Sequence, residues 1–191
     1  MVRLLLLALA LLLAGCDTRP QFGNTDISAA DYARDFALTD HTGKPRTMAD
    51  FRGRAVVIFF GYTQCPDVCP TTMTGMAEAM KLLGADAAKV QVLFVSVDPE
   101  RDTPELLAQY VPVFNPSFLG LYADAQTIAR TAQEFRVFYK KQPGSTPTTY
   151  TVDHTAGSYV YDPQGRLRLY IKHGEKPEVI AKDIKLLIAG K

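Results

Sequence analysis

The chain of 191 residues carries 21 lysine and arginine residues against 20 aspartate and glutamate residues, a formal net charge of +1. This balance argues against the basic surface that nucleic-acid binding requires, so we expect no nucleic-acid partner. The length suits one well-packed domain and hardly allows two.

The first 15 residues have the pattern of a secretory signal peptide. A single basic residue, Arg3, precedes an apolar run over residues 4–13. That run is too short to span a bilayer, which needs about 20 apolar residues. The sequence Leu13-Ala14-Gly15-Cys16 then resembles a bacterial lipoprotein box, in which the cysteine is lipidated and becomes the first residue of the mature chain. An ordinary secretory signal with an incidental cysteine is the alternative.

Asp17 directly follows Cys16 and resembles the signal that retains lipoproteins in the inner membrane. We therefore expect a lipid anchor at Cys16 in the bacterial inner (cytoplasmic) membrane, with the protein facing the periplasm. Residues 16–33 are polar and show no period, which predicts a flexible tether between the lipidated cysteine and a domain over residues 34–191.

From residue 34 onward, the patterns of strands and helices alternate. A strand-like segment at residues 36–39 leads into a turn, and the apolar runs 55–62 and 90–97 are typical of central strands buried on both faces. The expected helices cover about residues 70–83, 103–114, 124–135 and 176–187. The expected hairpins pair 138–141 with 148–152 and 158–161 with 167–171. This order predicts an α/β, thioredoxin-like fold with a central mixed sheet flanked by helices, an N-terminal strand extension and an inserted hairpin.

Cys65 and Cys69 lie between the strand at 55–62 and the helix at 70–83. Positions four apart on a helix have Cα atoms about 6.2 Å apart, which is within the ~4.4–6.8 Å range of disulfides. The same separation lets both sulfurs bind one metal ion. A helix N-terminus lowers the pKa of a thiol, which favours redox or metal chemistry over plain packing. In an oxidising compartment the free pair would tend to close into a Cys65–Cys69 disulfide.

A metal site with two thiolates needs at least one further ligand. The chain has three histidines, His41, His154 and His173. His41 and His173 fall in hydrophilic turns, whereas His154 precedes the strand at 158–161. In a thioredoxin-like sheet the loop before that strand lies against the dithiol turn. Most single histidines are surface or packing residues, so the residues alone leave the role of His154 open.

Three segments resemble the Sco/SenC family, and the similarity runs from about residue 36 to the C-terminus. They are Gly61-Tyr62-Thr63-Gln64-Cys65-Pro66-Asp67-Val68-Cys69-Pro70, Val97-Asp98-Pro99-Glu100-Arg101-Asp102-Thr103-Pro104 and Val152-Asp153-His154-Thr155. Members of this family are membrane-tethered, copper-binding proteins that take part in assembling cytochrome c oxidase. The resemblance implies that Cys65, Cys69 and His154 bind one copper ion per monomer, as Cu(I) or Cu(II). Many members are anchored by a transmembrane helix, and lipid at Cys16 would serve instead here.

The implied partner is subunit II of cytochrome c oxidase, or another periplasmic copper protein, as the acceptor of the metal. Soft thiolates select Cu(I), while Cu(II) prefers a more tetragonal site and should recruit an oxygen ligand. Zinc is the main chemical competitor. Asp67, Asp98 and Asp153 are candidates for supporting the site, and Asp67 is also a candidate oxygen ligand. Arg101 is expected to pair locally with Asp102, and Met73 to pack in the core.

The leading function is therefore a copper chaperone for the binuclear copper centre of the oxidase. The alternative is a thiol–disulfide oxidoreductase that reduces the cysteines of the copper acceptor. Residues 155–157 carry no proline where thioredoxin-like reductases have a cis-proline, which weakens a general reductase function. Thr63-x-Cys65 resembles the peroxidatic loop of peroxiredoxins, but no activating arginine is evident. A purely structural disulfide is a further alternative, although a loop of three residues restrains the unfolded chain little.

Overall fold

The computed structural model describes residues 20–146 and 149–191. The described strands are β1 (Thr25–Asp26), β2 (Leu38–Asp40), β3 (Pro45–Arg46), β4 (Ala55–Gly61), β5 (Val90–Ser96), β6 (Leu119–Tyr122), β7 (Tyr139–Gln142), β8 (Thr151–His154), β9 (Ser158–Tyr161) and β10 (Leu167–Ile171). The described α-helices are α2 (Val68–Leu83), α3 (Pro104–Phe114), α4 (Ala125–Glu134) and α5 (Pro177–Ile188), with short 3-10 helices at Met48–Phe51 and Gly84–Lys89. These elements form the predicted mixed α/β fold.

The main sheet has the order β1-β10-β9-β4-β5-β6-β2-β3. Its two central strands, β4 and β5, are buried at every position and pair in parallel from Ala55↔Val90 to Gly61↔Ser96. Such continuous apolar strands need cover on both faces, and the helices supply it. Because the carboxyl ends of β4 and β5 meet at one edge, the loops that follow them lie together there, where α/β proteins commonly bind ligands.

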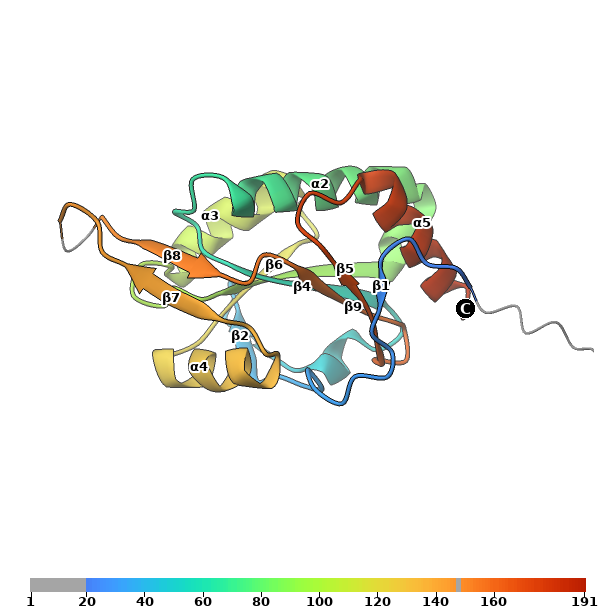
Figure 1. Ribbon diagram of the computed structural model, residues 1–191, viewed down its shortest axis with the longest axis horizontal. Coiled ribbons are helices and arrows are strands. Elements are labelled where there is room, and N and C mark those ends of the chain that lie inside the picture. The colour runs from blue at the N-terminus through green and yellow to red at the C-terminus, as the bar shows by residue number, and fades with distance from the viewer. Residues whose placement is uncertain (1–19, 147–148) are drawn as a thin grey trace, which may run out of the picture.

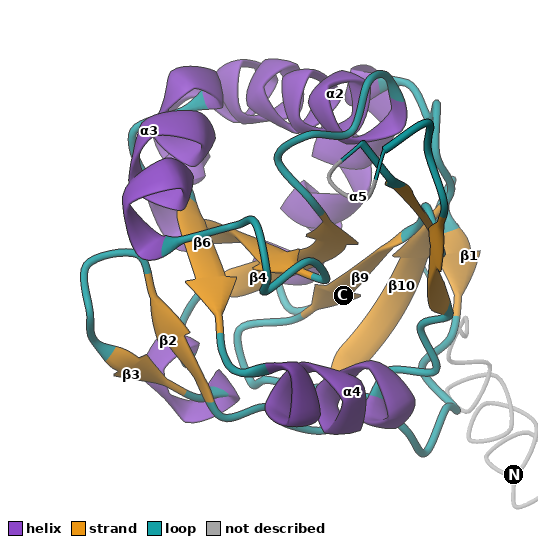
Figure 2. Ribbon diagram, turned by 90° about the vertical axis from the view of Figure 1, so that its left-hand side faces the viewer, coloured by secondary structure: helices purple, strands orange, loops and turns teal. Residues whose placement is uncertain are grey.

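Helices cover the sheet on both sides. Figure 2 shows α2 and α3 on one face and α4 on the opposite face, and α5 packs beside α2. The buried side of α2 carries Met73, Met76, Met80 and Leu83. Met73 is fully buried, which confirms its expected role in packing.

The inserted hairpin, β7 with β8, forms a separate two-stranded sheet that projects from the body of the protein (Figure 1). Its register runs from Tyr139↔His154 to Gln142↔Thr151. The second strand lies further along the chain than the sequence pattern predicts. As a result His154 is the last residue of β8, at the end of the hairpin nearest the main sheet.

Residues 20–33 differ from the predicted flexible tether. Thr25–Asp26 adds β1 to the edge of the main sheet beside β10. The buried carboxylate of Asp183 in α5 accepts hydrogen bonds from the backbone N–H groups of Gly23 and Asn24 and from the Asn24 side chain. These contacts are made mainly by the backbone, so they leave no apolar period in the sequence. The rest of the predicted tether, the signal segment at residues 1–15 and Cys16 lie outside the described residues.

The other predicted elements agree with the structure to within a few residues, whereas β3, β6 and the two 3-10 helices were not predicted from the sequence. Two helix starts are capped by side chains, since Thr103 accepts a hydrogen bond from the Leu106 N–H and Asp124 accepts one from the Thr127 N–H. Across the described parts of the chain, no helix combines the length and apolarity that crossing a membrane requires.

Candidate metal centre

The two cysteines lie where the chain leaves β4 and enters α2. Cys65 is in the connecting loop and partly exposed, whereas Cys69 lies in the first turn of α2 and is fully buried. The Cys69 backbone N–H donates a hydrogen bond of 3.4 Å to the Cys65 sulfur. A backbone donor and the N-terminal end of a helix therefore both face the Cys65 sulfur.

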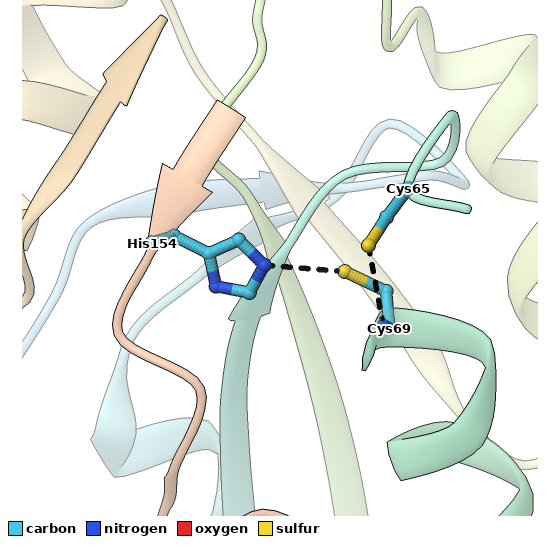
Figure 3. Close-up of side chains that lie close together, drawn as sticks. All are labelled: Cys65, Cys69 and His154. Atoms are coloured by element: carbon cyan, nitrogen blue, oxygen red, sulfur yellow. Dashed lines mark hydrogen bonds between the residues drawn. The ribbon is translucent and has the colours of Figure 1, made fainter. Parts of the chain in front are cut away.

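His154 reaches this pair from β8. Its Nε2 lies 3.4 Å from the Cys69 sulfur (Figure 3). Its Nδ1 lies 3.0 Å from the Thr155 carbonyl oxygen. A carbonyl oxygen can only accept, so Nδ1 carries the proton and donates to it. The lone pair of Nε2 is then directed at the sulfur. Burial lowers the pKa of His154, which keeps the imidazole neutral and able to bind a metal.

Two aromatic rings hold the imidazole in this orientation. The rings of Phe59 and Tyr62 each meet it edge-on, with centroid distances of 5.9 Å. Phe59 lies in β4 and Tyr62 directly follows it, and both are buried in the core. The position of His154 therefore depends on the main sheet, although His154 itself belongs to the hairpin.

The sulfur atoms of Cys65 and Cys69 and a ring nitrogen of His154 all lie within 4.8 Å of one another. Two metal–ligand bonds of about 2.0–2.3 Å each span nearly this distance, so small shifts would bring all three atoms onto one ion. Burial raises the pKa of the Cys69 thiol, so a metal ion would have to displace its proton on binding. Two sulfurs and one imidazole are the donor set that soft Cu(I) prefers. The residues fit copper.

Space for the Cys69 sulfur depends on Gly61, the last residue of β4. A Cβ at this position would lie 2.9 Å from that sulfur and 2.8 Å from the Phe59 ring. Outside the sulfur lies a cleft of about 480 Å³, lined among others by Tyr62, Cys65 and His154. Cys69 is therefore the buried ligand of the site, whereas Cys65 and His154 line the solvent-accessible cleft.

The three aspartates predicted to support the site do not join the group of ligand atoms. Asp67 is exposed at the rim of the cleft and accepts a hydrogen bond of 3.2 Å from the Thr71 hydroxyl. Asp153 is exposed, borders the same cleft and accepts a hydrogen bond from the Gln142 amide, and its charge partly offsets the lowering of the His154 pKa that burial causes. Asp98 is fully buried beneath the hairpin.

The expected ion pair between Arg101 and Asp102 is wrong. Arg101 pairs with Asp98 at 2.5 Å, while Asp102 accepts from the backbone and hydroxyl of Thr63 and from the Ser96 hydroxyl. Adjacent residues of a tight loop point in different directions, so proximity in sequence did not indicate the partner. Since the Thr63 hydroxyl is bound to Asp102, it is not available to a peroxidatic cysteine.

The other two histidines lie outside the group of ligand atoms. The His41 Nδ1 accepts from the Gly120 N–H, and the His173 Nδ1 lies 3.0 Å from the Thr72 hydroxyl.

The thiols of Cys65 and Cys69 are free in this structure, so the disulfide between them stays a prediction. The described residues contain no cis peptide bond, consistent with the absence of a proline at residues 155–157.

Two residues of the site were missed by the sequence interpretation. Gly61 could have been found, because a glycine inside a strand often marks a close approach of another group. Tyr150, which binds Asp98 and Arg101 from the hairpin, left no signal of its own in the pattern.

Fold and site together define a thioredoxin-like protein with a dithiol–imidazole site for a soft metal ion. The family model described as SCO1/SenC matches residues 24–189. The chain belongs to the SCO1/SenC family.

Individual relatives agree with this assignment. The mitochondrial SCO2 homolog of Mus musculus is 38% identical over 158 residues, which cover 82% of this chain and 62% of the relative. Among solved structures, Bradyrhizobium japonicum ScoI with copper bound is 42% identical with a TM-score of 0.74, covering 80% of this chain and 97% of that one. Apo Sco1 of Thermus thermophilus is 40% identical with a TM-score of 0.78, covering 87% and 97%. The chain spans about three fifths of the length of the curated mitochondrial relatives.

Proposed function

We propose that this protein binds one copper ion through Cys65, Cys69 and His154 and delivers it during the assembly of cytochrome c oxidase. The observation that carries the proposal is the approach of the His154 Nε2 to within 3.4 Å of the Cys69 sulfur, beside a second free thiol. Likeness to a solved structure of ScoI with copper bound supports the choice of metal. The acceptor is cytochrome c oxidase subunit II or another periplasmic copper protein.

The asymmetry of the three ligands suits delivery. Cys69 is buried, whereas Cys65 and His154 border a cleft that is open to solvent. An acceptor cysteine can therefore approach the ion from the side of Cys65 before the bond to Cys69 breaks. On oxidation to Cu(II), an oxygen ligand from water or from Asp67 at the rim would complete a more tetragonal shell.

The test is anaerobic titration of the reduced protein with Cu(I) in competition with a chromophoric chelator. This is followed by mixing with the metal-free copper domain of an oxidase subunit II. The proposal expects one ion per chain and, once a one-electron oxidant such as ferricyanide is added after transfer, growth of the mixed-valence absorption of the binuclear copper centre, with Cys69→Ser as the matched inactive variant. Failure to bind copper, or tight binding without any transfer, would contradict it.

A thiol–disulfide oxidoreductase is the second candidate, supported by the free thiols and by the backbone N–H aimed at the Cys65 sulfur. In this reaction Cys65 and Cys69 give two electrons and two protons to a disulfide of the acceptor and become a disulfide themselves. His154→Ala separates the functions, because it removes a copper ligand and leaves both thiols. Loss of tight copper binding, above all of Cu(II), with retained disulfide exchange would assign the two activities to different residues of one site.

We also propose that Cys16 is lipidated and holds the protein on the periplasmic side of the inner membrane. The lipoprotein box at residues 13–16 supports this placement. Replacement Cys16→Ser should move the protein from the membrane fraction to the soluble fraction, and unchanged membrane association would contradict the anchor.

A further inference from the structure

The loop after β5, residues 98–102, contacts the hairpin that carries His154. The carboxylate of Asp98 is fully buried and accepts two hydrogen bonds, from the Arg101 Nε at 2.5 Å and from the Tyr150 hydroxyl at 2.6 Å. Tyr150 immediately precedes β8. The buried carboxylate therefore receives its second hydrogen bond, in addition to that from Arg101 of its own loop, only when the hairpin packs against this loop.

Arg101 extends the same contact to the dithiol loop. Its Nη1 donates to the Tyr150 carbonyl oxygen at 2.9 Å and to the Gln64 side-chain oxygen at 3.2 Å. The guanidinium lies 3.6 Å from the centroid of the Tyr150 ring and 5.7 Å from that of Tyr62. Gln64 is the neighbour of Cys65, and the Tyr62 ring packs against His154. Arg101 therefore contacts the dithiol loop and the hairpin at once.

The hairpin needs such a support. A two-stranded hairpin alone is marginally stable, and this one pairs with no strand of the main sheet among the described residues. His154 ends β8 near the main sheet, and Tyr150 immediately precedes β8, toward the other end of the hairpin. The contacts of Asp98 and Arg101 with Tyr150 therefore determine how closely β8, and with it His154, packs against the cysteines.

We infer that Asp98, Arg101 and Tyr150, here called the hairpin clamp, position His154 for copper without binding the ion themselves. This inference rests on the proposed copper site. Loss of the clamp should leave the dithiol intact, so Cu(I) would still be held by two sulfurs. Cu(II), which depends more on the imidazole, would be held less well. The clamp therefore controls the ratio of Cu(II) to Cu(I) affinity, and its loss should raise the reduction potential of the bound copper.

The first arm of the test uses the reduced, metal-free protein. Arg101→Met removes the cation, and Tyr150→Phe removes one hydroxyl and is the milder change. Arg46→Met is the matched control, since it removes an arginine from another fully buried aspartate, Asp40, away from the site. Hydrogen exchange of the amides at residues 151–154 should accelerate about ten-fold in Arg101→Met and a few-fold in Tyr150→Phe, and stay unchanged in Arg46→Met.

The second arm measures Cu(II) and Cu(I) affinity of the same proteins. Cu(II) affinity should fall by about 10–100-fold in Arg101→Met, the range found for residues that orient metal ligands, with a smaller fall for Cu(I). An equal fall for both ions, or the same effects in Arg46→Met, would overturn the inference. If Arg101→Met does not fold, Tyr150→Phe decides. If wild type binds no copper, the proposed function fails, and the exchange arm alone decides whether the clamp holds the hairpin.

Discussion

The two ends of the main sheet use buried aspartates in different ways. At the end away from the cysteines, Asp40 ends β2 and Asp162 follows β9, and each binds groups two to six residues further along the chain. At the metal end, Asp98 and Asp102 also bind groups nearby in the chain, Arg101 and Ser96, but in addition each binds a partner 52 or 39 residues away. The chemistry is the same, a buried carboxylate with hydroxyl, N–H and guanidinium donors.

This difference in hydrogen-bond partners indicates that the buried aspartates have different structural roles at the two ends. A turn closed on itself stabilises one connection and contributes nothing to the placement of distant groups. The carboxylates at the metal end instead join the dithiol loop and the hairpin to β5, and so fix the relative positions of Cys65, Cys69 and His154. Changes at the two ends should therefore cost similar stability but differ in their effect on the site.

The largest effect is expected from Asp102→Ala. It would leave the Thr63 N–H and hydroxyl and the Ser96 hydroxyl without their acceptor, at a cost of about 3 kcal/mol in the free energy of unfolding. Asp162→Ala should cost about as much. Urea unfolding measures both costs, and hydrogen exchange of residues 63–69 should accelerate only in Asp102→Ala. Equal acceleration of exchange at residues 63–69 in the two variants would contradict the proposed difference between the two ends of the sheet.

Gly61→Ala should cost about 2 kcal/mol, because the new Cβ would lie under 3.0 Å from both the Cys69 sulfur and the Phe59 ring. Gly75→Ala is the control, since a Cβ in that part of α2 meets nothing within 4 Å. The control should be neutral or stabilise by about 0.5–1 kcal/mol. Thermal unfolding and copper titration together measure the result, and a Gly61→Ala protein with normal stability and normal copper affinity would contradict the packing described.

Protonation of Asp40 at low pH should lower the stability of the protein at the end of the sheet away from the cysteines. Burial raises the pKa of its carboxyl, but hydrogen bonds from Thr42, Arg46 and backbone amides outweigh burial and lower the pKa to about 2. Below about pH 4 the unfolded chain then binds more protons than the folded chain. The contribution of Asp40 to the free energy of unfolding is therefore complete above that pH and is lost as the pH falls toward 2. Asp40→Asn should cost about 2 kcal/mol at pH 7. Urea unfolding from pH 7 to 2.5 should show this difference shrinking, and a difference independent of pH would refute it.

The smallest effect is expected at His154 in the metal-free protein. Burial lowers the pKa of this imidazole, so the unfolded chain binds its proton first as the pH falls through the ordinary histidine range. His154 should therefore titrate below about pH 6.5 and reduce stability slightly as the pH falls through that value. NMR titration of the ring carbons measures it, and a pKa at or above the ordinary value would mean that the ring is not enclosed by Phe59 and Tyr62.

The same comparison explains what the sequence could predict. β4, β5 and α2 follow from apolar runs and helical spacing, and the closed turn at Asp162 follows from Asp162-Pro163-Gln164-Gly165, because these are local signals. The dithiol is likewise local. The contacts of Tyr150 with Asp98 and Arg101 join segments that are about 50 residues apart in the chain, and sequence spacing does not predict such contacts.

His154 lies between these cases. Its place before β9 indicated a position near the cysteines, and the family resemblance supplied the role of ligand. The proton on Nδ1 and the enclosing rings became visible only in the structure. The tether prediction failed over residues 20–33 for a related reason, since backbone hydrogen bonds to Asp183 carry no side-chain pattern.

The most direct measurement is Cu(II) addition to the reduced protein under anaerobic conditions, followed by optical absorption and electron paramagnetic resonance. A dithiol–imidazole site predicts one Cu(II) per chain, a thiolate-to-copper charge-transfer band and hyperfine coupling to a single nitrogen that disappears in His154→Ala. A wild-type protein without that band that also binds no Cu(I), or a nitrogen signal unchanged in His154→Ala, would contradict the account.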